Sequence, residues 1–280
     1  MADFLLAHEP AVRLIAFSSI FAAMALFELL APRRQQAVSR GRRWPSNLGI
    51  VALDTLFVRI IFPTTAVGVA LVAESKGWGL FHVMALPAWA AVVLGVILLD
   101  LAIYLQHVLV HAVPALWRLH RMHHADLEFD VTTGARFHPF EILLSMVLKL
   151  MVITALGVPA VAVLVFEVLL NATAMFNHSN VRIPTRFDRV LRLIVVTPDM
   201  HRIHHSVVPK ETNSNFGFNL PWWDRLFGTY RAEPAAGQMG MTIGLDQFRD
   251  PAEQRLDRML TQPFRDGSDS YSMGRGKAAE

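Results

Sequence analysis

Histidine dominates the residues of this chain that could do chemistry. Ten of its twelve histidines fall between positions 107 and 205, and eight of them form three spaced clusters. The clusters read His107-x-x-x-His111, His120-x-x-His123-His124 and His201-x-x-His204-His205. Residues three or four apart share one face of a helix, so each cluster can aim two or three imidazoles at one point. Eight imidazoles exceed the four ligands of a tetrahedral metal, which predicts a site with two metal ions.

The residue types limit which metals could bind. The chain contains no cysteine, which excludes cysteine-ligated zinc, an iron–sulfur cluster and a disulfide framework. Imidazole suits zinc, copper, iron and nickel, and the spacing alone does not choose between iron and zinc. The His-Glu-x-x-His motif of zinc hydrolases does not occur in the sequence.

Two single histidines lie between the clusters. His178 follows an apolar segment that should return to the site, and we interpret it as a ligand. His138 precedes a proline at an expected helix start and is a weaker candidate, as a ligand or as a residue behind the ligands. His8 and His82 lie outside the interval, and we exclude them. Asn177 is a further candidate because it adjoins His178.

Asp100 and Tyr104 precede the first cluster at helical spacing and share its face. A carboxylate there could orient a ligand imidazole through the second ring nitrogen. The alternative is that Asp100 pairs with Arg59 or another buried polar group. Ionisable groups at membrane depth are costly and are usually functional, which favours the orienting role.

The composition indicates a membrane protein. Hydrophobic residues make up 53% of the 280 residues and charged residues 18%, and the mean hydropathy is +0.37. Soluble domains have about 45–50% apolar and about 25% charged residues. The pI near 9.6 comes mainly from arginine clusters beside apolar segments, which we interpret as orientation signals rather than as a nucleic-acid surface.

Four apolar segments, at about 12–31, 48–73, 86–106 and 142–170, approach or exceed the roughly 20 residues that a spanning helix needs. Acidic residues rather than a basic stretch begin the first, which indicates a retained span and not a signal peptide. Gly157 and Pro159 interrupt the last and favour two shorter helices in a hairpin. The predicted fold is an all-α membrane bundle of about four spans with a cytoplasmic, histidine-rich helical cap.

The loops suggest an orientation for this bundle. Residues 33–43 contain five arginines, whereas the loop after the second span has only Lys76. The excess of basic residues in cytoplasmic loops therefore places 33–43 in the cytoplasm, and the third span returns there near His107. A hairpin at 142–170 keeps His178 on that face, whereas a single span would strand it on the other.

The rest of the chain is mixed in character. Residues 182–192 are basic and suit a surface of anionic lipid, and Trp222 and Trp223 fit an interfacial position. From about Arg265 the sequence is Gly/Ser-rich and charged, which predicts a disordered tail. We expect one membrane-embedded domain over 1–264, with its metal-binding core at about 100–231, and a tail at 265–280.

These motifs together resemble the fatty acid hydroxylase superfamily, also called the sterol desaturase family. The resemblance covers about 100–231 closely and the upstream spans more loosely. It rests on the three clusters and on the surrounding patterns Trp-x-x-His-Arg-x-His-His, Arg-x-His-Pro-x-Glu, Asn-His-Ser-Asn, Thr-Pro-x-x-His-x-x-His-His and Trp-Asp-Arg-Leu-Phe-Gly-Thr-Tyr.

The resemblance implies a membrane-embedded di-iron site, dioxygen as co-substrate and a lipid substrate. By carry-over, the iron ligands would be His107, His111, His120, His123, His124, His178, His201, His204 and His205. Some relatives have another histidine four residues before the one that matches His178. Ala174 stands there in this chain, which leaves a tenth ligand to His138 or a water.

Relatives fused to a cytochrome b5 domain carry their own electron donor. No such domain is present here, so electrons would come from NAD(P)H through a separate protein such as a ferredoxin or a cytochrome b5-like protein.

We therefore predict a di-iron membrane monooxygenase that converts a lipid C–H bond to an alcohol or a double bond. No catalytic residue beyond the metal ligands is expected. One alternative is a non-oxidative enzyme that processes a lipid or an aldehyde with zinc or iron. A distant alternative is a metal transporter or heme-binding membrane protein, which the position of the histidines at span ends disfavours. The compact chain is typical of a bacterial protein, which would place it in the plasma membrane with the active site facing the cytoplasm.

Overall fold

The computed structural model of the protein describes residues 1–267 and 271–274. Regular structure in these residues is helical, with two isolated β-bridges, Pro32–Val181 and Ser206–Ile243. Five described segments are long and apolar enough to cross a membrane. They are α2 (Glu9–Leu30), the segment Arg40–Val83, α6 (Ala88–Ala112), α8 (Pro139–Leu156) and α9 (Ala160–Asn177). The predicted all-α bundle is confirmed.

Helix α9 lies at the centre of the bundle. It packs against α2, α4 (Ala66–Lys76) and α6, and α1 (Ala2–Ala7) also contacts it. Its side chains Ala162, Val163 and Phe166 are fully buried. The outer faces of the surrounding helices expose large apolar side chains such as Ile60 and Trp89. This arrangement suits a hydrocarbon surrounding, because each helix satisfies its own backbone hydrogen bonds.

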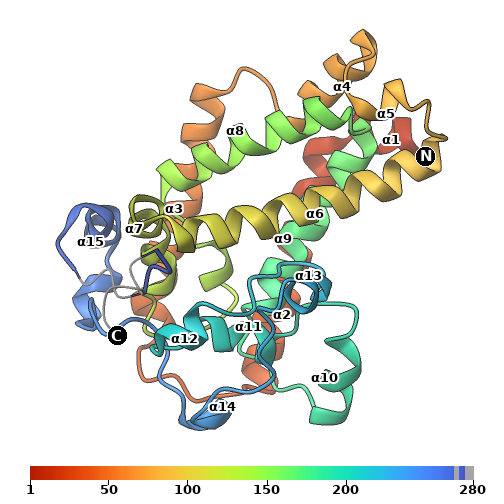
Figure 1. Cartoon of the computed structure of the whole chain (residues 1–280). Coiled ribbons are helices and arrows are strands. Elements are labelled where there is room, and N and C mark those ends of the chain that lie inside the picture. The colour runs from red at the N-terminus through yellow and green to blue at the C-terminus, as the bar shows by residue number, and fades with distance from the viewer. Residues whose placement is uncertain (268–270, 275–280) are drawn as a thin grey trace.

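The last apolar block is a hairpin of α8 and α9, as the sequence predicted. Gly157 ends α8 in the left-handed conformation, with φ +67°, and Pro159 precedes α9. A Cβ atom at Gly157 would lie 2.4 Å from the carbonyl oxygen of Trp78. Both the positive φ and this close approach require glycine. The hairpin returns the chain to the end of the bundle from which α8 started (Figure 1).

The second predicted span, 48–73, is two helices rather than one. Helix α3 (Arg40–Ile61) ends before Pro63, and α4 begins after Thr65, whose hydroxyl accepts a hydrogen bond from the Gly68 N–H at 3.1 Å. Proline lacks the N–H that a continuous helix needs, so the break falls there. The short helix α5 (Leu80–Val83) follows α4.

Short helices form the cap at one side of the bundle, away from α4 and α5 (Figure 1). Helix α7 follows α6 after the extended residue Val113, because Pro114 suits the first turn of a new helix. The cap elements are α7 (Pro114–His124), α10 (Thr185–Leu191), α11 (Pro198–His204), α12 (Pro209–Thr212), α13 (Trp222–Leu226), α14 (Gly237–Gly240), α15 (Leu256–Thr261) and the 3-10 turns Thr133–Ala135, Pro251–Gln254 and Gln262–Phe264.

Part of the predicted tail packs on the cap, which differs from the expected disorder. Tyr271 is buried, its ring stacks on Trp117 at 5.9 Å between centroids, and its hydroxyl donates to the Val207 carbonyl at 2.8 Å. An aromatic residue with a hydrogen-bonded hydroxyl offsets the entropy of ordering the segment. The predicted tail also includes 268–270 and 275–280, which lie outside the described residues.

Candidate metal centre

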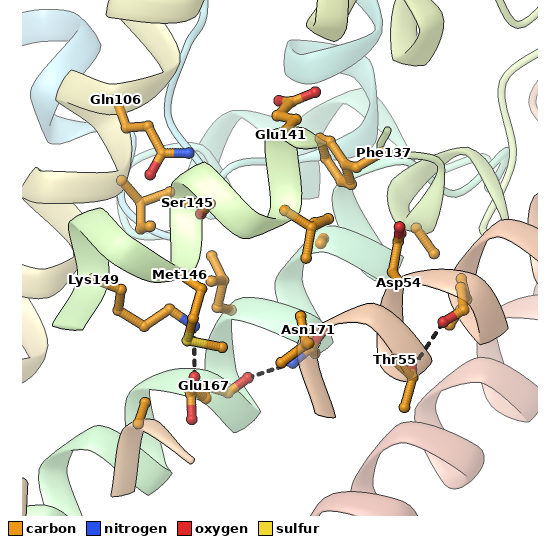
Figure 2. A pocket seen from close by; sticks show the side chains of 18 of the residues that line it. Asp54, Thr55, Gln106, Phe137, Glu141, Ser145, Met146, Lys149, Glu167 and Asn171 are labelled. Atoms are coloured by element: carbon orange, nitrogen blue, oxygen red, sulfur yellow. Dashed lines mark hydrogen bonds and ion pairs between the residues drawn. The ribbon is translucent and has the colours of Figure 1, made fainter. Parts of the chain in front are cut away.

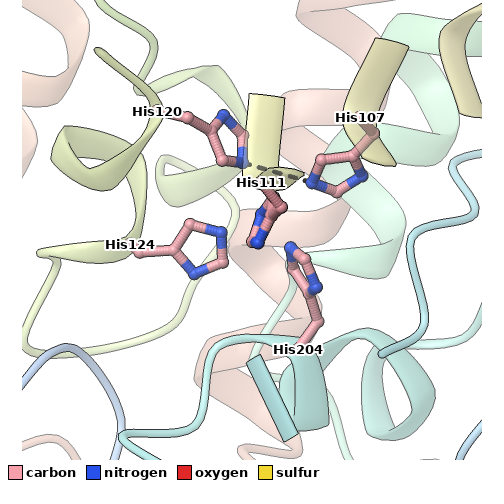
Figure 3. A group of neighbouring side chains, drawn as sticks. All are labelled: His107, His111, His120, His124 and His204. Atoms are coloured by element: carbon pink, nitrogen blue, oxygen red, sulfur yellow. Dashed lines mark hydrogen bonds between the residues drawn. The ribbon is translucent and has the colours of Figure 1, made fainter. Parts of the chain in front are cut away.

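Two groups of buried histidines lie where α6, α7, α9 and α11 meet. In each group, one ring nitrogen of every member lies within 4.8 Å of those of the others. Figure 3 shows the rings of the larger group arranged around a common point. The larger group is His107, His111, His120, His124 and His204, and the smaller is His123, His178, His201 and His205. The structure thus brings together the nine histidines that the sequence analysis proposed as ligands.

Both His-x-x-His-His clusters contribute to both groups. In α7, His120 and His124 face the larger group, whereas His123 faces the smaller. Residues four apart point the same way on a helix, and the residue between them is rotated toward the neighbouring group. The groups are consequently adjacent, with 4.6 Å between the ring centroids of His124 and His205. This arrangement suits two metal ions held close together.

Fixed oxygen acceptors orient six of the nine rings. Because a carbonyl or carboxylate oxygen can only accept, each of these rings carries its proton on Nδ1 and turns the Nε2 lone pair inward. The Nδ1 contacts are His107 to Phe216 O (2.7 Å), His111 to Asn213 Oδ1 (3.0 Å), His120 to Glu141 Oε1 (2.6 Å), His123 to Arg136 O (3.2 Å), His178 to Ala174 O (2.8 Å) and His204 to Ser214 O (2.8 Å). Such contacts fix ring orientation and tautomer in metal sites.

The inward nitrogens face one another and lack protein donors. Nε2 of His178 lies 3.2 Å from Nε2 of His123 and 3.1 Å from Nε2 of His201. Nε2 of His111 and of His204 is buried and has no hydrogen-bond partner within 1–267 and 271–274. Lone pairs that converge in this way repel unless a cation lies between them. The donor set therefore fits transition-metal ions that accept imidazole nitrogen.

Burial favours the neutral form of four of these imidazoles. Desolvation by burial, reinforced by the neighbouring imidazoles, holds the pKa of His123, His124 and His204 well below its usual range. Burial also lowers the pKa of His178 to about 3. A neutral ring offers its lone pair at physiological pH, so these residues need not lose a proton to take up a metal.

Glu141 in the first turn of α8 brings a carboxylate to the larger group. Its Oε1 accepts from Nδ1 of His120 at 2.6 Å, and both side chains are buried. The sequence analysis did not single out Glu141 as a site residue, although it ends the Arg-x-His-Pro-x-Glu pattern. The sequence feature that could have identified it is a glutamate three residues after a histidine at the start of a helix.

We expect Glu141→Gln to retain metal but to lower turnover about 10–100-fold, the usual effect of changing a residue that orients a ligand histidine. The amide oxygen still accepts from His120, but the negative charge that increases the basicity of the ring is lost. Metal per chain and turnover in the same preparation test this. Glu74→Gln, whose carboxylate caps α9 through the Ala160 N–H, is the matched control. Unchanged turnover in Glu141→Gln would contradict the assignment.

The four weaker candidates lie outside both histidine groups. Asp100 does not orient an imidazole. It accepts hydrogen bonds from the N–H groups of Asn219 and Leu220 and from the Trp223 indole, because the loop after α12 folds back onto α6. The Tyr104 hydroxyl contacts the Thr229 hydroxyl, and the Asn177 amide donates to Phe218 O.

His138 caps the start of α8. Its Nδ1 accepts from the Phe140 N–H at 3.3 Å, and its Nε2 faces Leu260 O at 3.3 Å. With both ring nitrogens engaged in this way, His138 has a structural role at the helix terminus. The proline that follows it is the sequence signal of that role.

One family model and several known proteins are similar in sequence to this chain. The fatty acid hydroxylase family model matches residues 92–229. The ornithine lipid hydroxylase of Rhizobium tropici is 31% identical over 236 residues, which cover 81% of this chain and 70% of that protein. The human alkylglycerol monooxygenase is 27% identical over 204 residues, 70% of this chain and 42% of that protein. The cholesterol 25-hydroxylase of Rattus norvegicus is 26% identical over 165 residues, 58% of this chain and 53% of that protein. No solved structure matches the chain significantly.

Proposed function

Because the chain belongs to the fatty acid hydroxylase family, we propose that it uses dioxygen to oxidise a C–H bond of a lipid at a pair of histidine-bound iron ions. In the balanced reaction, R–H, O2, two electrons and two protons give R–OH and water. Desaturation uses the same inputs and releases two waters. The named relatives are lipid hydroxylases or monooxygenases, which supports an oxidative reaction over a hydrolytic one.

One observation carries this proposal: a cavity of about 650 Å³ among the spanning helices has His107 and His120 in its wall. Ligand pockets typically measure about 300–1,000 Å³ and are mostly apolar. Apolar side chains such as Val58, Ile103 and Met146 line much of this one. A lipid chain in the cavity would reach the larger histidine group without leaving the protein.

The protein's own residues hold and shield the reacting centre. The nine histidines would bind two metal ions, which supply the activation of dioxygen when bound. Phe137 stacks on His123, with ring centroids 4.4 Å apart, and Phe218 lies against His107 at 5.1 Å. These aromatic rings would exclude water from the side of the centre that meets the cavity, and exclusion of water strengthens the electrostatic interactions inside.

The reaction needs an external electron donor, for which we propose a ferredoxin or a cytochrome b5-like protein drawing on NAD(P)H. Residues 33–43 lie on the histidine side of the bundle: Arg33 bonds Asp199 of α11, and Arg43 bonds Asp126 just after α7. The excess of arginine in this segment supports a cytoplasmic location for the centre. A donor in the bacterial cytoplasm could then reach it.

The deciding experiment combines metal analysis with a product assay. The protein is purified in detergent after expression with iron, mixed with a bacterial lipid extract, reductant and dioxygen, and the lipids are analysed by mass spectrometry. We expect about two irons per chain, because each group offers at least the four donors that one metal needs. We also expect dioxygen-dependent addition of one oxygen atom to a lipid, or loss of two hydrogens.

Zinc in both groups after iron-rich expression, together with unchanged lipids, would overturn the oxidative proposal and favour the non-oxidative enzyme. Metal uptake into vesicles without any change in lipid would favour transport instead. A variant that lacks one ligand of each group, His123→Ala with His204→Ala, is the control for lipid oxidation by loosely bound iron.

A further inference from the structure

We propose that Asp54 and Glu141 form a subsite in the cavity wall for a hydrogen-bond donor of the substrate. The inference rests on the proposed function and specifies its substrate class. The substrate would be a lipid that carries an amine or a hydroxyl group close to the carbon that is oxidised. A lipid without such a donor would bind more weakly.

The first observation is where the two carboxylates lie. Asp54 comes from α3 and Glu141 from α8, two helices that pack against each other, and both line the cavity that reaches His107 and His120 (Figure 2). Asp54 is 8% exposed and Glu141 is 5% exposed. Because Glu141 also holds His120, the subsite adjoins the larger histidine group.

The second observation is that each carboxylate keeps one oxygen without a partner. Oδ1 of Asp54 and Oε2 of Glu141 are buried and make no hydrogen bond with any residue that the structure describes. Oε1 of Gln106, a third residue of the same wall, is unpartnered as well. A carboxyl or amide oxygen that carries no hydrogen accepts hydrogen bonds, so the group that would satisfy these oxygens is a donor.

The cations of the wall do not fill this role. Lys149 and Arg13 both pair with Glu167, and Arg13 also pairs with Glu9. Arg59 lines the same cavity but is exposed. Burying an unsatisfied carboxylate among apolar side chains at membrane depth is costly, and such groups usually mark a functional site.

Placement next to the centre gives the subsite a chemical purpose. A donor held by Asp54 fixes one point of the lipid, and the adjacent carbons then lie toward His107 and His120. Holding the reacting bond in one position is what allows oxidation at a single carbon of a chain with many similar bonds. An ammonium group would bind more tightly than a hydroxyl, because hydrogen bonds between charged groups are roughly twice as strong.

The test measures binding without turnover. Displacement of tritiated hexadecylamine from the detergent-purified protein is measured with unlabelled hexadecylamine, hexadecan-1-ol and palmitate. We expect the amine to bind tightest, the alcohol next and palmitate weakest, because its carboxylate is repelled. Asp54→Asn should weaken binding of hexadecylamine at least about tenfold, as expected for loss of a charge-assisted hydrogen bond. It should also reduce the difference in affinity between hexadecylamine and palmitate.

Thr55→Val is the matched control. Thr55 lines the same cavity, but its hydroxyl is already bonded to the Val51 carbonyl at 2.8 Å, so the order of affinities should persist. Asp54→Ala provides a second variant in case the asparagine does not fold, and both are checked for a monodisperse elution profile and bound metal.

Equal binding of the three probes, or full amine affinity in a folded Asp54 variant, overturns the subsite. Neither result bears on whether the protein oxidises lipids, because no step of the assay requires turnover. The two proposals therefore fail separately.

Discussion

Replacing His204 by alanine should weaken metal binding at the larger histidine group and reduce lipid oxidation more than about 100-fold, beyond the loss expected from a residue that only orients a ligand. His204 is fully buried, its Nδ1 is fixed by Ser214 O, and its Nε2 faces the group without a partner. Four imidazoles of the group remain in this variant, but each keeps its own position, so none of these rings supplies a nitrogen where Nε2 of His204 lies. Iron per chain and turnover in the same preparation measure the effect.

His123→Ala tests the smaller group in the same way. Nε2 of His123 lies 3.2 Å from Nε2 of His178, and the His123 ring stacks on Phe137. We expect His123→Ala to retain about one iron per chain, because the smaller group then has three of its four ligands while the larger group keeps all of its donors. His204→Ala should bind iron more weakly at the larger group, which keeps four imidazoles. Turnover should be lost in both variants, since the proposed chemistry needs both metals.

His138→Ala is the control for these substitutions. His138 is buried like the ligands, but it caps α8 and belongs to neither group. We expect full metal content and a loss of about 0.5–2 kcal/mol in stability, the usual cost of removing a helix cap. Full iron and full activity in His204→Ala would remove that residue from the site.

The sequence indicated the histidine clusters because their spacing matches a helix face. It also located the hairpin, since Gly157 and Pro159 break a block that is otherwise uniformly apolar. Spacing could not show how the clusters divide. His123 and His124 are neighbours in the chain but belong to different groups, and only the packing of α7 against α11 and the end of α9 decides that.

The groups that accept hydrogen bonds from Nδ1 of the ligand histidines were harder to predict. Most are backbone carbonyls, such as Phe216 O and Ser214 O, and a carbonyl has no residue type that a pattern could reveal. Asp100 was expected to hold a ring because it shares a helix face with His107. It binds the N–H groups of a folded-back loop instead, a contact between residues far apart in the sequence. Tyr271 was missed because its segment is rich in small polar residues.

Replacing Asp126 by alanine should destabilise the protein by about 3–5 kcal/mol, the usual cost of removing one partner from a buried ion pair. Arg43 donates two hydrogen bonds to Asp126, at 2.7 and 2.8 Å, and one to Asp130 at 2.7 Å, and all three side chains are fully buried. The unfolding midpoint in detergent, measured at fixed metal content, tests this expectation.

The stabilisation by Asp126 should depend on pH. Burial alone would raise the pKa of this carboxyl, but Arg43 and Arg136 outweigh it and hold the pKa well below its usual range. A group whose pKa is lowered by folding stabilises the folded state above its unfolded pKa, about 3.9 for aspartate, and loses that contribution as the pH falls further. The wild type should therefore lose stability below about pH 4, and Asp126→Asn should lose less there because it has no carboxyl to titrate.

The buried network of Arg43, Asp126 and Asp130 also supports the metal centre. Its loss should therefore affect both the stability and the metal content of the protein. Arg136, in the same loop, presents the carbonyl that orients His123, and a Cβ atom at Gly134 would lie 2.6 Å from Ala174 O, the acceptor of His178. Movement of this loop would misplace two ligands of the smaller group. We expect Asp126→Ala to lose metal from that group first, as its unfolding midpoint falls.

An exposed ion pair provides the comparison. Arg255 and Asp257 form a bridge with side chains 70% and 61% exposed, and such pairs contribute little because water screens them. Arg255→Ala should leave the midpoint and the metal content unchanged. If Asp126→Ala behaved like Arg255→Ala, the buried network would not hold the loop, and the orientation of His123 and His178 would have to arise from α7 and α9 alone.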